Sequence, residues 1–305
     1  MDIKKNIIET IGNTPMVSLH NIKEKENIKA ELIAKLEYFN PGGSAKDRVA
    51  LNMIEKAEKE GRLKPGAAII EPTSGNTGIG IALVAAAKGY RAIMVMPDTM
   101  SIERQKLIKA YGAEVVLTEG SKGMAGSVEK AEELAKELPG AIVAGQFDNP
   151  ANPEIHYMTT GPEIYQQTEG NVDILVAGVG TGGTLSGTAK FLKEKSPNLK
   201  VIAVEPFDSP LISKGISGPH KLQGIGANFI PENLDKDVID EVITVSTEEA
   251  MDTMRLLASE EGIFAGISSG AALFAAISVA KRDENKGKNI VVIIVDTGER
   301  YLSTL

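Results

Sequence analysis

Residues 40–48 read Asn40-Pro41-Gly42-Gly43-Ser44-Ala45-Lys46-Asp47-Arg48 and connect a strand-like run, residues 31–37, to a helical pattern. Proline and paired glycines make the connection a turn. Ser44 suits a helix N-cap, which places Lys46 in the first helical turn. That end of a helix dipole disfavours a cation. Lys46 is therefore either a surface lysine paired with Asp47, or an amine with a depressed pKa that acts as a nucleophile or Schiff base.

The composition fits a globular protein of one large domain or two. The chain has 305 residues, of which 42% are apolar and 24% charged. It has no cysteine, which excludes disulfides and thiolate metal sites and fits an intracellular protein. His20, His156 and His220 show no metal-ligand spacing, so no metal is expected. The net charge of −8 argues against nucleic acid or an anionic membrane as a partner.

No targeting or membrane segment is expected. The N-terminus lacks the long apolar run of a signal peptide. No apolar stretch approaches the roughly 20 residues that span a bilayer. A cytoplasmic location is the resulting expectation.

Strand-like runs alternate with helical patterns along the chain. Strands are expected over residues 32–36, 67–70, 91–96, 114–117, 141–144, 172–179, 200–204, 241–245 and 289–295. Helices are expected over residues 76–88, 101–111, 127–138, 184–195, 247–262 and 268–282, the helix at 247 opening with a capping box from Ser246 to Glu249. This alternation predicts an α/β fold with a mostly parallel sheet covered by helices on both faces.

Three clusters of glycine, serine and threonine lie where a strand gives way to a helix, which is where open α/β sheets bind ligands. They are Glu-Pro-Thr-Ser-Gly-Asn-Thr-Gly at 71–78, Gly-Thr-Gly-Gly-Thr at 180–184 and Ala-Gly-Ile-Ser-Ser-Gly-Ala-Ala at 265–272. Free N–H groups in the first can hold a carboxylate or phosphate, and the second resembles a phosphate cradle. The first and third also fit ordinary helix caps.

Two known nucleotide-binding motifs match the second cluster only in part. A Walker A loop requires Gly-Lys-Ser/Thr, which this sequence lacks there. A dinucleotide fingerprint fits Glu205 at the end of the next strand, but Leu185 stands where the third glycine belongs. Together with Lys46, the three clusters specify pyridoxal phosphate, which needs a lysine, a phosphate cradle and a partner for its ring nitrogen.

Nearly the whole chain resembles the cysteine synthases (O-acetylserine sulfhydrylases), which are fold-type II, tryptophan synthase β-like pyridoxal-phosphate enzymes. The matching motifs lie at residues 11–15, 40–48, 71–78, 146–152, 159–164, 180–184, 223–226, 266–270 and 298–304. The resemblance implies two open, mostly parallel twisted sheets covered by helices. It also implies a large cofactor-binding domain, residues 1–37 and 149–305, and a small mobile domain, residues 38–148.

The resemblance carries roles over to single positions. Lys46 is implied to bind pyridoxal 5'-phosphate and then to take the substrate α-proton, Asn76 to bond the cofactor's phenolic oxygen and Ser268 to face its ring nitrogen. The residues implied to hold the phosphate are Gly180, Thr181, Gly182, Gly183 and Thr184. Those implied to bind the substrate are Thr73, Ser74, Gly75, Thr77, Gln146 and Gly224. One departure is Val295-Asp296-Thr297, which differs from the Pro-Ser-Ser type expected near Ser268.

The implied reaction is a β-replacement that makes L-cysteine and acetate from O-acetyl-L-serine and sulfide through a bound α-aminoacrylate. A serine at the ring nitrogen does not protonate it, which suits β-elimination over transamination. A homodimer is implied, as is a complex with serine acetyltransferase through the C-terminal tail of that acetyltransferase. An intact Lys46 disfavours a purely non-catalytic role in such a complex.

The alternative reaction is that of a cystathionine β-synthase, in which homocysteine is the nucleophile. Homocysteine carries a second amino acid head group that needs its own polar pocket. The candidates for that pocket lie in the irregular segment 206–235, which is long enough to be functional, and are Asp208, Lys214, His220 and Lys221. These residues show no clear pairing in the sequence, so sulfide is favoured.

Overall fold

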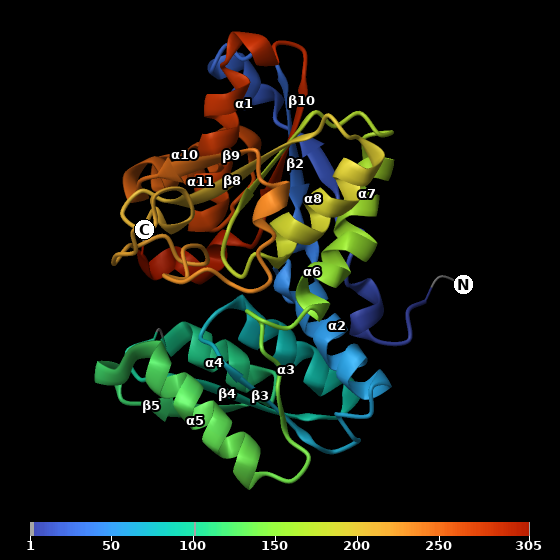
Figure 1. The fold of residues 1–305 in the computed structure, drawn as a ribbon, viewed down its shortest axis with the longest axis vertical. Coiled ribbons are helices and arrows are strands. Elements are labelled where there is room, and N and C mark those ends of the chain that lie inside the picture. The colour runs from blue at the N-terminus through green and yellow to red at the C-terminus, as the bar shows by residue number, and fades with distance from the viewer. Residues whose placement is uncertain (1–2, 101, 305) are drawn as a thin grey trace. The chain divides into compact units, whose positions relative to one another are not determined.

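The structure, a computed structural model, describes residues 3–100 and 102–304. Its internal contacts divide the chain into two compact units. Unit 1 comprises the described parts of Met1–Ile11 and Asn40–Asn152, and unit 2 comprises Gly12–Phe39 and the described part of Pro153–Leu305. Each unit is built around one sheet with helices against it (Figure 1). The predicted α/β class with two mostly parallel sheets is therefore confirmed. The mobility of a smaller domain stays a prediction.

Unit 1 contains a four-stranded parallel sheet in the order β5-β4-β3-β6. Its strands are β3 (Ala68–Pro72), β4 (Arg91–Pro97), β5 (Glu114–Thr118) and β6 (Ile142–Val143). Its helices are η1 (Ile7–Thr10), α2 (Lys46–Lys59), α3 (Asn76–Lys88), α4 (Ile102–Ala110), η3 (Gly120–Lys122) and α5 (Gly123–Glu137). The short helix α6 (Ala151–Ile155) follows.

Successive side chains of the unit 1 strands point to opposite faces of the sheet, as strand geometry requires. Ile70, Ile93 and Val95 belong to one apolar core with Ala131 of α5. On the other face, a Cβ added to Gly78 of α3 would lie 3.3 Å from the sulfur of Met94, so α3 packs closely there. Helices on both faces explain why β3 and β4 are almost continuously apolar.

Unit 2 contains a six-stranded sheet in the order β1-β2-β10-β7-β8-β9. Among its described strands, β1 runs antiparallel to β2 and the other pairs are parallel. The strands are β1 (Met16–Ser18), β2 (Glu31–Leu36), β7 (Ile174–Gly178), β8 (Lys200–Pro206), β9 (Glu241–Val245) and β10 (Asn289–Ile294). The α-helices are α1 (His20–Lys25), α7 (Gly161–Gln167), α8 (Gly183–Lys195), α9 (Leu211–Lys214), α10 (Thr247–Glu261) and α11 (Ile267–Ala280).

Further short helices of unit 2 are 3₁₀ segments, except for η4, which is a π-helix. They are η2 (Glu37–Phe39), η4 (His156–Thr160), η5 (Lys236–Val238) and η6 (Asp283–Asn285). A further 3₁₀ helix, η7 (Gly298–Thr304), follows β10.

Two apolar cores cover the two faces of the unit 2 sheet. Ile290, Val292 and Ile294 of β10 join a core with α10 and α11, whereas Val291 and Ile293 join a core with α8. Figure 1 shows α10 and α11 on one side of this sheet and α7 and α8 on the other. Every side chain of β10 from Ile290 onward is therefore buried, which explains its unbroken apolar sequence.

Local signals predicted several helix boundaries. The capping box is present: Ser246 Oγ accepts from Glu249 N–H at 3.2 Å, and Glu249 Oε2 accepts from Ser246 N–H at 2.8 Å. Helix α2 begins at Lys46 with Ala45 in the N-cap position, one residue after the predicted cap, Ser44. The Ser44 hydroxyl nevertheless accepts the Lys46 N–H at 3.2 Å.

Other boundaries differ from the prediction. Helix α5 begins at Gly123, four positions before the predicted start at residue 127. The predicted helix over 101–111 is α4, and residue 101 lies outside the described residues. The short helices α1 and α9 were not predicted. Helices this short lack the two turns of apolar periodicity from which a helix is recognised.

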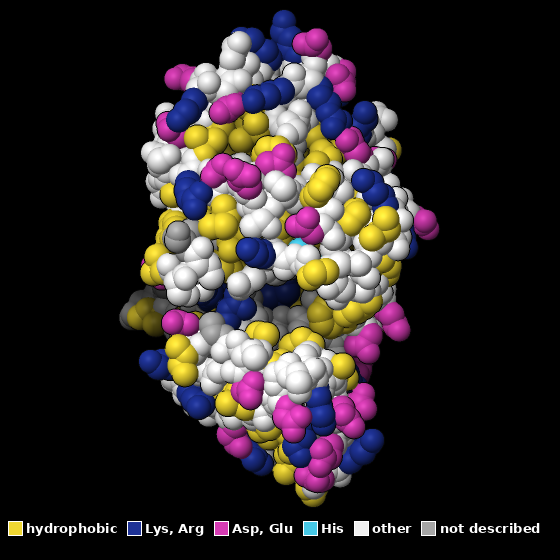
Figure 2. Space-filling model, turned by 90° about the vertical axis from the view of Figure 1, so that its left-hand side faces the viewer, with side chains coloured by type: hydrophobic (Ala, Val, Ile, Leu, Met, Phe, Trp, Pro, Cys, Tyr) yellow, Lys and Arg dark blue, Asp and Glu magenta, His cyan; other side chains and the backbone are white. Residues whose placement is uncertain are grey.

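The molecular surface carries charges of both signs. On the face drawn in Figure 2, Lys and Arg side chains and Asp and Glu side chains are scattered among hydrophobic and other side chains. None of the helices in residues 3–100 and 102–304 has the length and apolar character needed to cross a membrane.

Candidate active site

Lys46 lies at the start of α2, where the side chain of Asp47 holds the preceding turn of residues 40–45. Asp47 Oδ2 accepts the Gly42 N–H at 2.5 Å. A Cβ on Gly42 would lie 2.5 Å from Asp47 Oδ1, so only glycine fits beside that carboxylate. Helix α3 passes close to this point, because a Cβ on Gly80 would lie 2.9 Å from the Lys46 carbonyl oxygen. The fold of unit 1 thus places the partly buried Lys46 against α3.

The first cluster forms the loop that leads into α3. Thr73 Oγ1 accepts the Gly75 N–H at 3.2 Å, and the extended Gly75 is the N-cap of the helix. Asn76 and Thr77 open the first turn, where backbone N–H groups have no partner within the helix. Arg104 Nη1 of α4 lies 3.5 Å from the Ser74 carbonyl oxygen. This helix start is suited to an anion such as a carboxylate.

Gln146 lies at the same end of the unit 1 sheet, in the turn after β6. The Thr77 hydroxyl donates to Gln146 Oε1 at 2.5 Å, and both side chains are buried. The structure therefore brings together the predicted substrate residues of the first cluster and Gln146. They are 69 positions apart in the sequence.

Glu71 belongs to the first cluster but is not among the residues predicted to bind the cofactor or the substrate. It is buried at the end of β3, and its carboxylate accepts backbone N–H groups of Gly145 and Gln146 at 2.8 and 3.3 Å. Burial raises the pKa of Glu71 from 4.5 to about 7, against the lowering effect of these hydrogen bonds. The signal for it in the sequence is a carboxylate at the end of the apolar run Ala68-Ile69-Ile70.

The second cluster forms the loop between β7 and α8 in unit 2. Gly182 is the N-cap of α8 and has φ +84°, a conformation that glycine adopts without strain. A Cβ on Gly182 would lie 2.8 Å from the Leu234 backbone, and one on Gly180 would lie 2.3 Å from the Gly224 carbonyl oxygen. Thr181, Gly183 and Thr184 complete a compact loop at the N-terminus of a 13-residue helix. Its N–H groups and hydroxyls fit a phosphate.

His156, which is not among the predicted site residues, supports this loop. Its Nε2 lies 3.1 Å from Thr184 Oγ1, and its Nδ1 lies 2.9 Å from Thr160 Oγ1. It opens the π-helix η4, a rare conformation that is frequent at functional sites. Lys190, the cation nearest to the loop along the chain, lies instead over the ring of Tyr157 at 5.7 Å.

Ser268 lies in the first turn of α11, in the third cluster. Its Oγ would lie 3.4 Å from a Cβ on Gly224, and its side chain is buried. Because Gly224 also contacts Gly180, unit 2 brings the second and third clusters together. Asp296 is buried nearby: it accepts from the Tyr301 hydroxyl at 2.6 Å, and its Oδ1 would lie 2.1 Å from a Cβ on Gly266.

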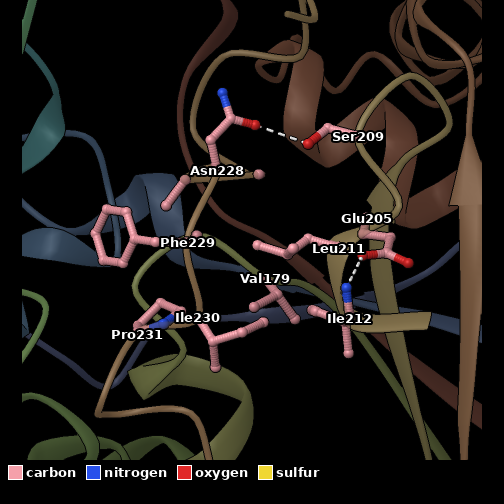
Figure 3. Close-up of a pocket in the computed structure, with 12 residues that line it drawn as sticks. Val179, Glu205, Ser209, Leu211, Ile212, Asn228, Phe229, Ile230 and Pro231 are labelled. Atoms are coloured by element: carbon pink, nitrogen blue, oxygen red, sulfur yellow. Dashed lines mark hydrogen bonds between the residues drawn. The ribbon is translucent and has the colours of Figure 1, made fainter. Parts of the chain in front are cut away.

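A pocket beside Gly180 is lined largely by the irregular segment 206–235 (Figure 3). Glu205 reaches into its wall and accepts N–H groups of Ile212 and Ser213 at 2.7 and 3.0 Å. Across the pocket, Ser209 Oγ donates to Asn228 Oδ1 at 2.7 Å. Glu205 therefore binds backbone N–H groups at the start of α9. In a dinucleotide site, the acidic residue at this position would bind a ribose hydroxyl instead.

Comparison with known proteins identifies the class of this protein. Residues 7–296 match the family described as pyridoxal-phosphate dependent enzyme. The chain is 57% identical over 300 residues to a cysteine synthase of Staphylococcus aureus (strain Mu50 / ATCC 700699), covering 98% of this chain and 96% of that protein. The chain therefore belongs to the pyridoxal-phosphate dependent enzymes, and pyridoxal phosphate is its cofactor. The predicted resemblance to the cysteine synthases is confirmed.

Solved structures agree with this assignment. A cysteine synthase from Entamoeba histolytica superposes with a TM-score of 0.96 at 50% identity, covering 99% of this chain and 90% of that one. A hydrogen sulfide-producing enzyme from Fusobacterium nucleatum superposes with a TM-score of 0.95 at 49% identity, covering 99% of each chain. The fold is accordingly that of the fold-type II enzymes.

Proposed function

We propose that this chain is a cysteine synthase, which makes L-cysteine and acetate from O-acetyl-L-serine and sulfide. The observation that carries the proposal is the 57% identity to a cysteine synthase over 98% of the chain. Bound pyridoxal phosphate supplies the electron sink for loss of the α-proton and of acetate. The protein supplies the groups that bind, orient and exchange protons.

In unit 1, Lys46 binds the cofactor through its amine and takes the α-proton of the substrate. The close approach of α2 and α3 at Gly80 supports this role, since it brings Lys46 next to the helix that Asn76 opens. Asn76 donates to the cofactor's phenolic oxygen. The substrate carboxylate is received by Thr73, Ser74, Gly75, Thr77 and Gln146. The position of these residues at the N-terminus of α3 and the bond from Thr77 to Gln146 support that assignment.

In unit 2, the loop Gly180, Thr181, Gly182, Gly183 and Thr184 holds the phosphate of the cofactor. The positive φ of Gly182 and the lack of room for any side chain at Gly180 support this role. The Ser268 hydroxyl bonds the ring nitrogen, and Gly224 lines the cleft beside it. The position of Gly224 next to both Gly180 and Ser268 supports the last two assignments.

Borohydride reduction of the holoenzyme followed by peptide mass analysis tests the assignment of Lys46. The cofactor's mass should appear on the peptide that contains Lys46. A product assay with O-acetylserine plus sulfide should yield cysteine and acetate. Labelling of a different lysine would refute the role of Lys46, and absence of cysteine would refute the proposed function.

The surface of segment 206–235 supports sulfide over homocysteine as the nucleophile. Asp208, Lys214 and Lys221 are exposed, and the His220 Nε2 lies 2.7 Å from the Gly226 carbonyl oxygen. A second amino acid head group would need buried polar partners to replace its water. With sulfide and homocysteine at equal concentrations, cysteine should dominate; cystathionine as the main product would favour the cystathionine β-synthase reaction.

The assembly and the location belong to the same proposal. The protein is a cytoplasmic homodimer and forms a complex with serine acetyltransferase through the C-terminal tail of that enzyme. The similarity of nearly the whole chain to cysteine synthases supports the proposed assembly and the proposed location. Light scattering of the purified protein measures dimerisation, and the same measurement with a peptide of the acetyltransferase tail measures formation of the complex.

A further inference from the structure

The buried carboxylate of Glu71 has no part in the proposed binding of the cofactor or the substrate. It lies at the end of β3 and is separated by one residue, Pro72, from the loop that leads into α3. Its side chain is 1% exposed. A carboxylate in such a place is costly unless hydrogen bonds compensate for its lost water. Its bonding partners therefore indicate what it stabilises.

Glu71 continues the pairing of β3 with β6 after the regular ladder ends. That ladder pairs Ile70 with Val143, and the Ala144 N–H still donates to the Ile70 carbonyl at 3.0 Å. The next two N–H groups, of Gly145 and Gln146, donate instead to the two oxygens of the Glu71 carboxylate. Gly145 has φ +72°, so the chain turns away from the sheet at this point.

The carboxylate also contacts the side chain of Gln146, which hydrogen-bonds to it. Gln146 Oε1 in turn accepts from the Thr77 hydroxyl at 2.5 Å. Because the Gln146 carbonyl oxygen accepts from Asn152 Nδ2 at 2.8 Å, both its backbone and its amide group are fixed. The result is a line of contacts, Glu71 to Gln146 to Thr77, which starts at the sheet and ends at the first turn of α3.

We propose that Glu71 is a positioning residue that orients the Gln146 amide and the Thr77 hydroxyl for recognition of the substrate carboxylate, without itself touching the substrate. This inference rests on the proposed function. Without Glu71, the turn at residues 145–146 loses its acceptor, and the Gln146 amide loses the partner that selects its orientation. The effect should fall on ligands that carry a carboxylate, because only they use these groups.

The chain contains a matched control, Glu205. It also precedes a proline at the end of a parallel strand, is buried, and accepts two backbone N–H groups, those of Ile212 and Ser213. The part of the chain that the structure describes shows no bond from Glu205 to Gln146 or Thr77. Glu205→Gln therefore reproduces the loss of a buried strand-end carboxylate elsewhere in the protein.

The test compares two ligands of the holoenzyme through the absorption spectrum of the cofactor. L-Methionine carries the α-carboxylate, and 3-(methylthio)propylamine is the same molecule without it. For Glu71→Gln we expect the dissociation constant of methionine to rise about tenfold, the effect of losing one well-placed hydrogen bond, and that of the amine to change less than about twofold. Glu205→Gln should leave the ratio of the two constants unchanged.

A double-mutant cycle shows whether Glu71 acts through Gln146. In a Gln146→Ala background, Glu71→Gln should have no further effect on methionine binding. If Glu71→Gln fails to fold, Glu71→Asp serves in its place, since it keeps the charge and shortens the reach by one methylene.

Three results would overturn the inference: equal weakening of both ligands, an unchanged methionine constant, or additive effects in the cycle. Failure of the proposed function would give a different result from these three. If the proposed function were wrong, the wild-type holoenzyme itself would not bind methionine more tightly than the amine.

Discussion

The Thr77 hydroxyl donates to Gln146 Oε1 at 2.5 Å, and this bond joins the first turn of α3 to the turn that follows β6. Three strands, β4, β5 and β6, lie between these segments in the sequence. The bond exists because parallel strands end at the same edge of the sheet, so that the loops after β3 and β6 meet. The proposed binding site for the substrate carboxylate depends on this contact between the two loops.

Replacing Thr77 tests the contact directly. Thr77→Val removes the hydroxyl and leaves the buried Gln146 oxygen without this donor, which should cost about 1–2 kcal/mol. We expect the KM for O-acetylserine to rise by about tenfold, with a smaller change in kcat, in steady-state assays. Thr77→Ser retains the hydroxyl and should remain near wild type. An equal loss in both variants would attribute the effect to packing.

Lys46 is expected to be necessary for turnover and dispensable for folding. Lys46→Ala removes the proposed base, and such groups contribute about 100- to 10,000-fold to rates. Cysteine formation should fall by about this factor or more, while the circular dichroism spectrum stays unchanged because Lys46 is only partly buried. Lys56→Ala, on the same helix, serves as the control and should retain activity.

The phosphate loop should tolerate no side chain at Gly182. Gly182→Ala places a Cβ 2.8 Å from the Leu234 backbone at a φ of +84°, so it should lower both unfolding free energy and cofactor affinity. Gly61→Ala is the control, since Gly61 has φ +71° and open space around its Cβ position. We expect about 1 kcal/mol of destabilisation at Gly61 and clearly more at Gly182 in urea titrations. Equal losses of unfolding free energy in the two variants would show that only the backbone strain at positive φ matters, and not the contact with Leu234.

Ser268 is expected to tune the cofactor ring. Ser268→Ala should retain the cofactor and lose about fivefold in affinity, the effect of one neutral hydrogen bond. Ser268→Asp places a carboxylate at the start of α11 and should shift the cofactor's absorption maximum by protonating the ring nitrogen. A spectrum and turnover identical to wild type in Ser268→Asp would contradict its place at the ring.

Glu71 should make the stability of the protein depend on pH. Its pKa is about 7 in the folded protein and about 4.5 when unfolded. Between these values the folded state holds a proton that the unfolded state has lost, so stability falls as pH rises through this window. The loss should total about 3 kcal/mol and be complete above pH 7. The neighbouring charge of Asp148 acts in the same direction.

Urea unfolding of wild type and Glu71→Gln at about pH 5 and pH 8 measures this contribution. The variant should lack the part of the pH dependence that comes from Glu71, whatever its stability at a single pH. An identical pH dependence in both proteins would show that the carboxyl is not the titrating group.

Local sequence was sufficient for the elements that depend on short-range signals. The capping box at Ser246 was predicted because both of its bonds join residues three positions apart. The apolar run at residues 289–295 predicted the strand β10. The motif around Lys46 indicated the cofactor only together with the three clusters, and these motifs with the others along the chain indicated the enzyme family.

The sequence did not predict contacts between residues that lie far apart in the chain. Lys35 lies in β2 with its amine buried and bonded to Glu163 Oε2 of α7 at 2.7 Å, across 128 positions. His156 supports Thr184 across 28 positions, and neither contact leaves a periodic signal. The order of strands, with β10 inserted between β2 and β7, is equally invisible in the pattern.

The sequence by itself therefore determined the fold class, the cofactor and the family, because these depend on motifs whose residues are adjacent in the chain. Only the tertiary structure decided which of those residues meet. Glu71 and Gln146 lie 75 positions apart, and their contact depends on two parallel strands ending side by side. Burial then raises the pKa of Glu71 to about 7, a property that the same glutamate would not have in an extended chain.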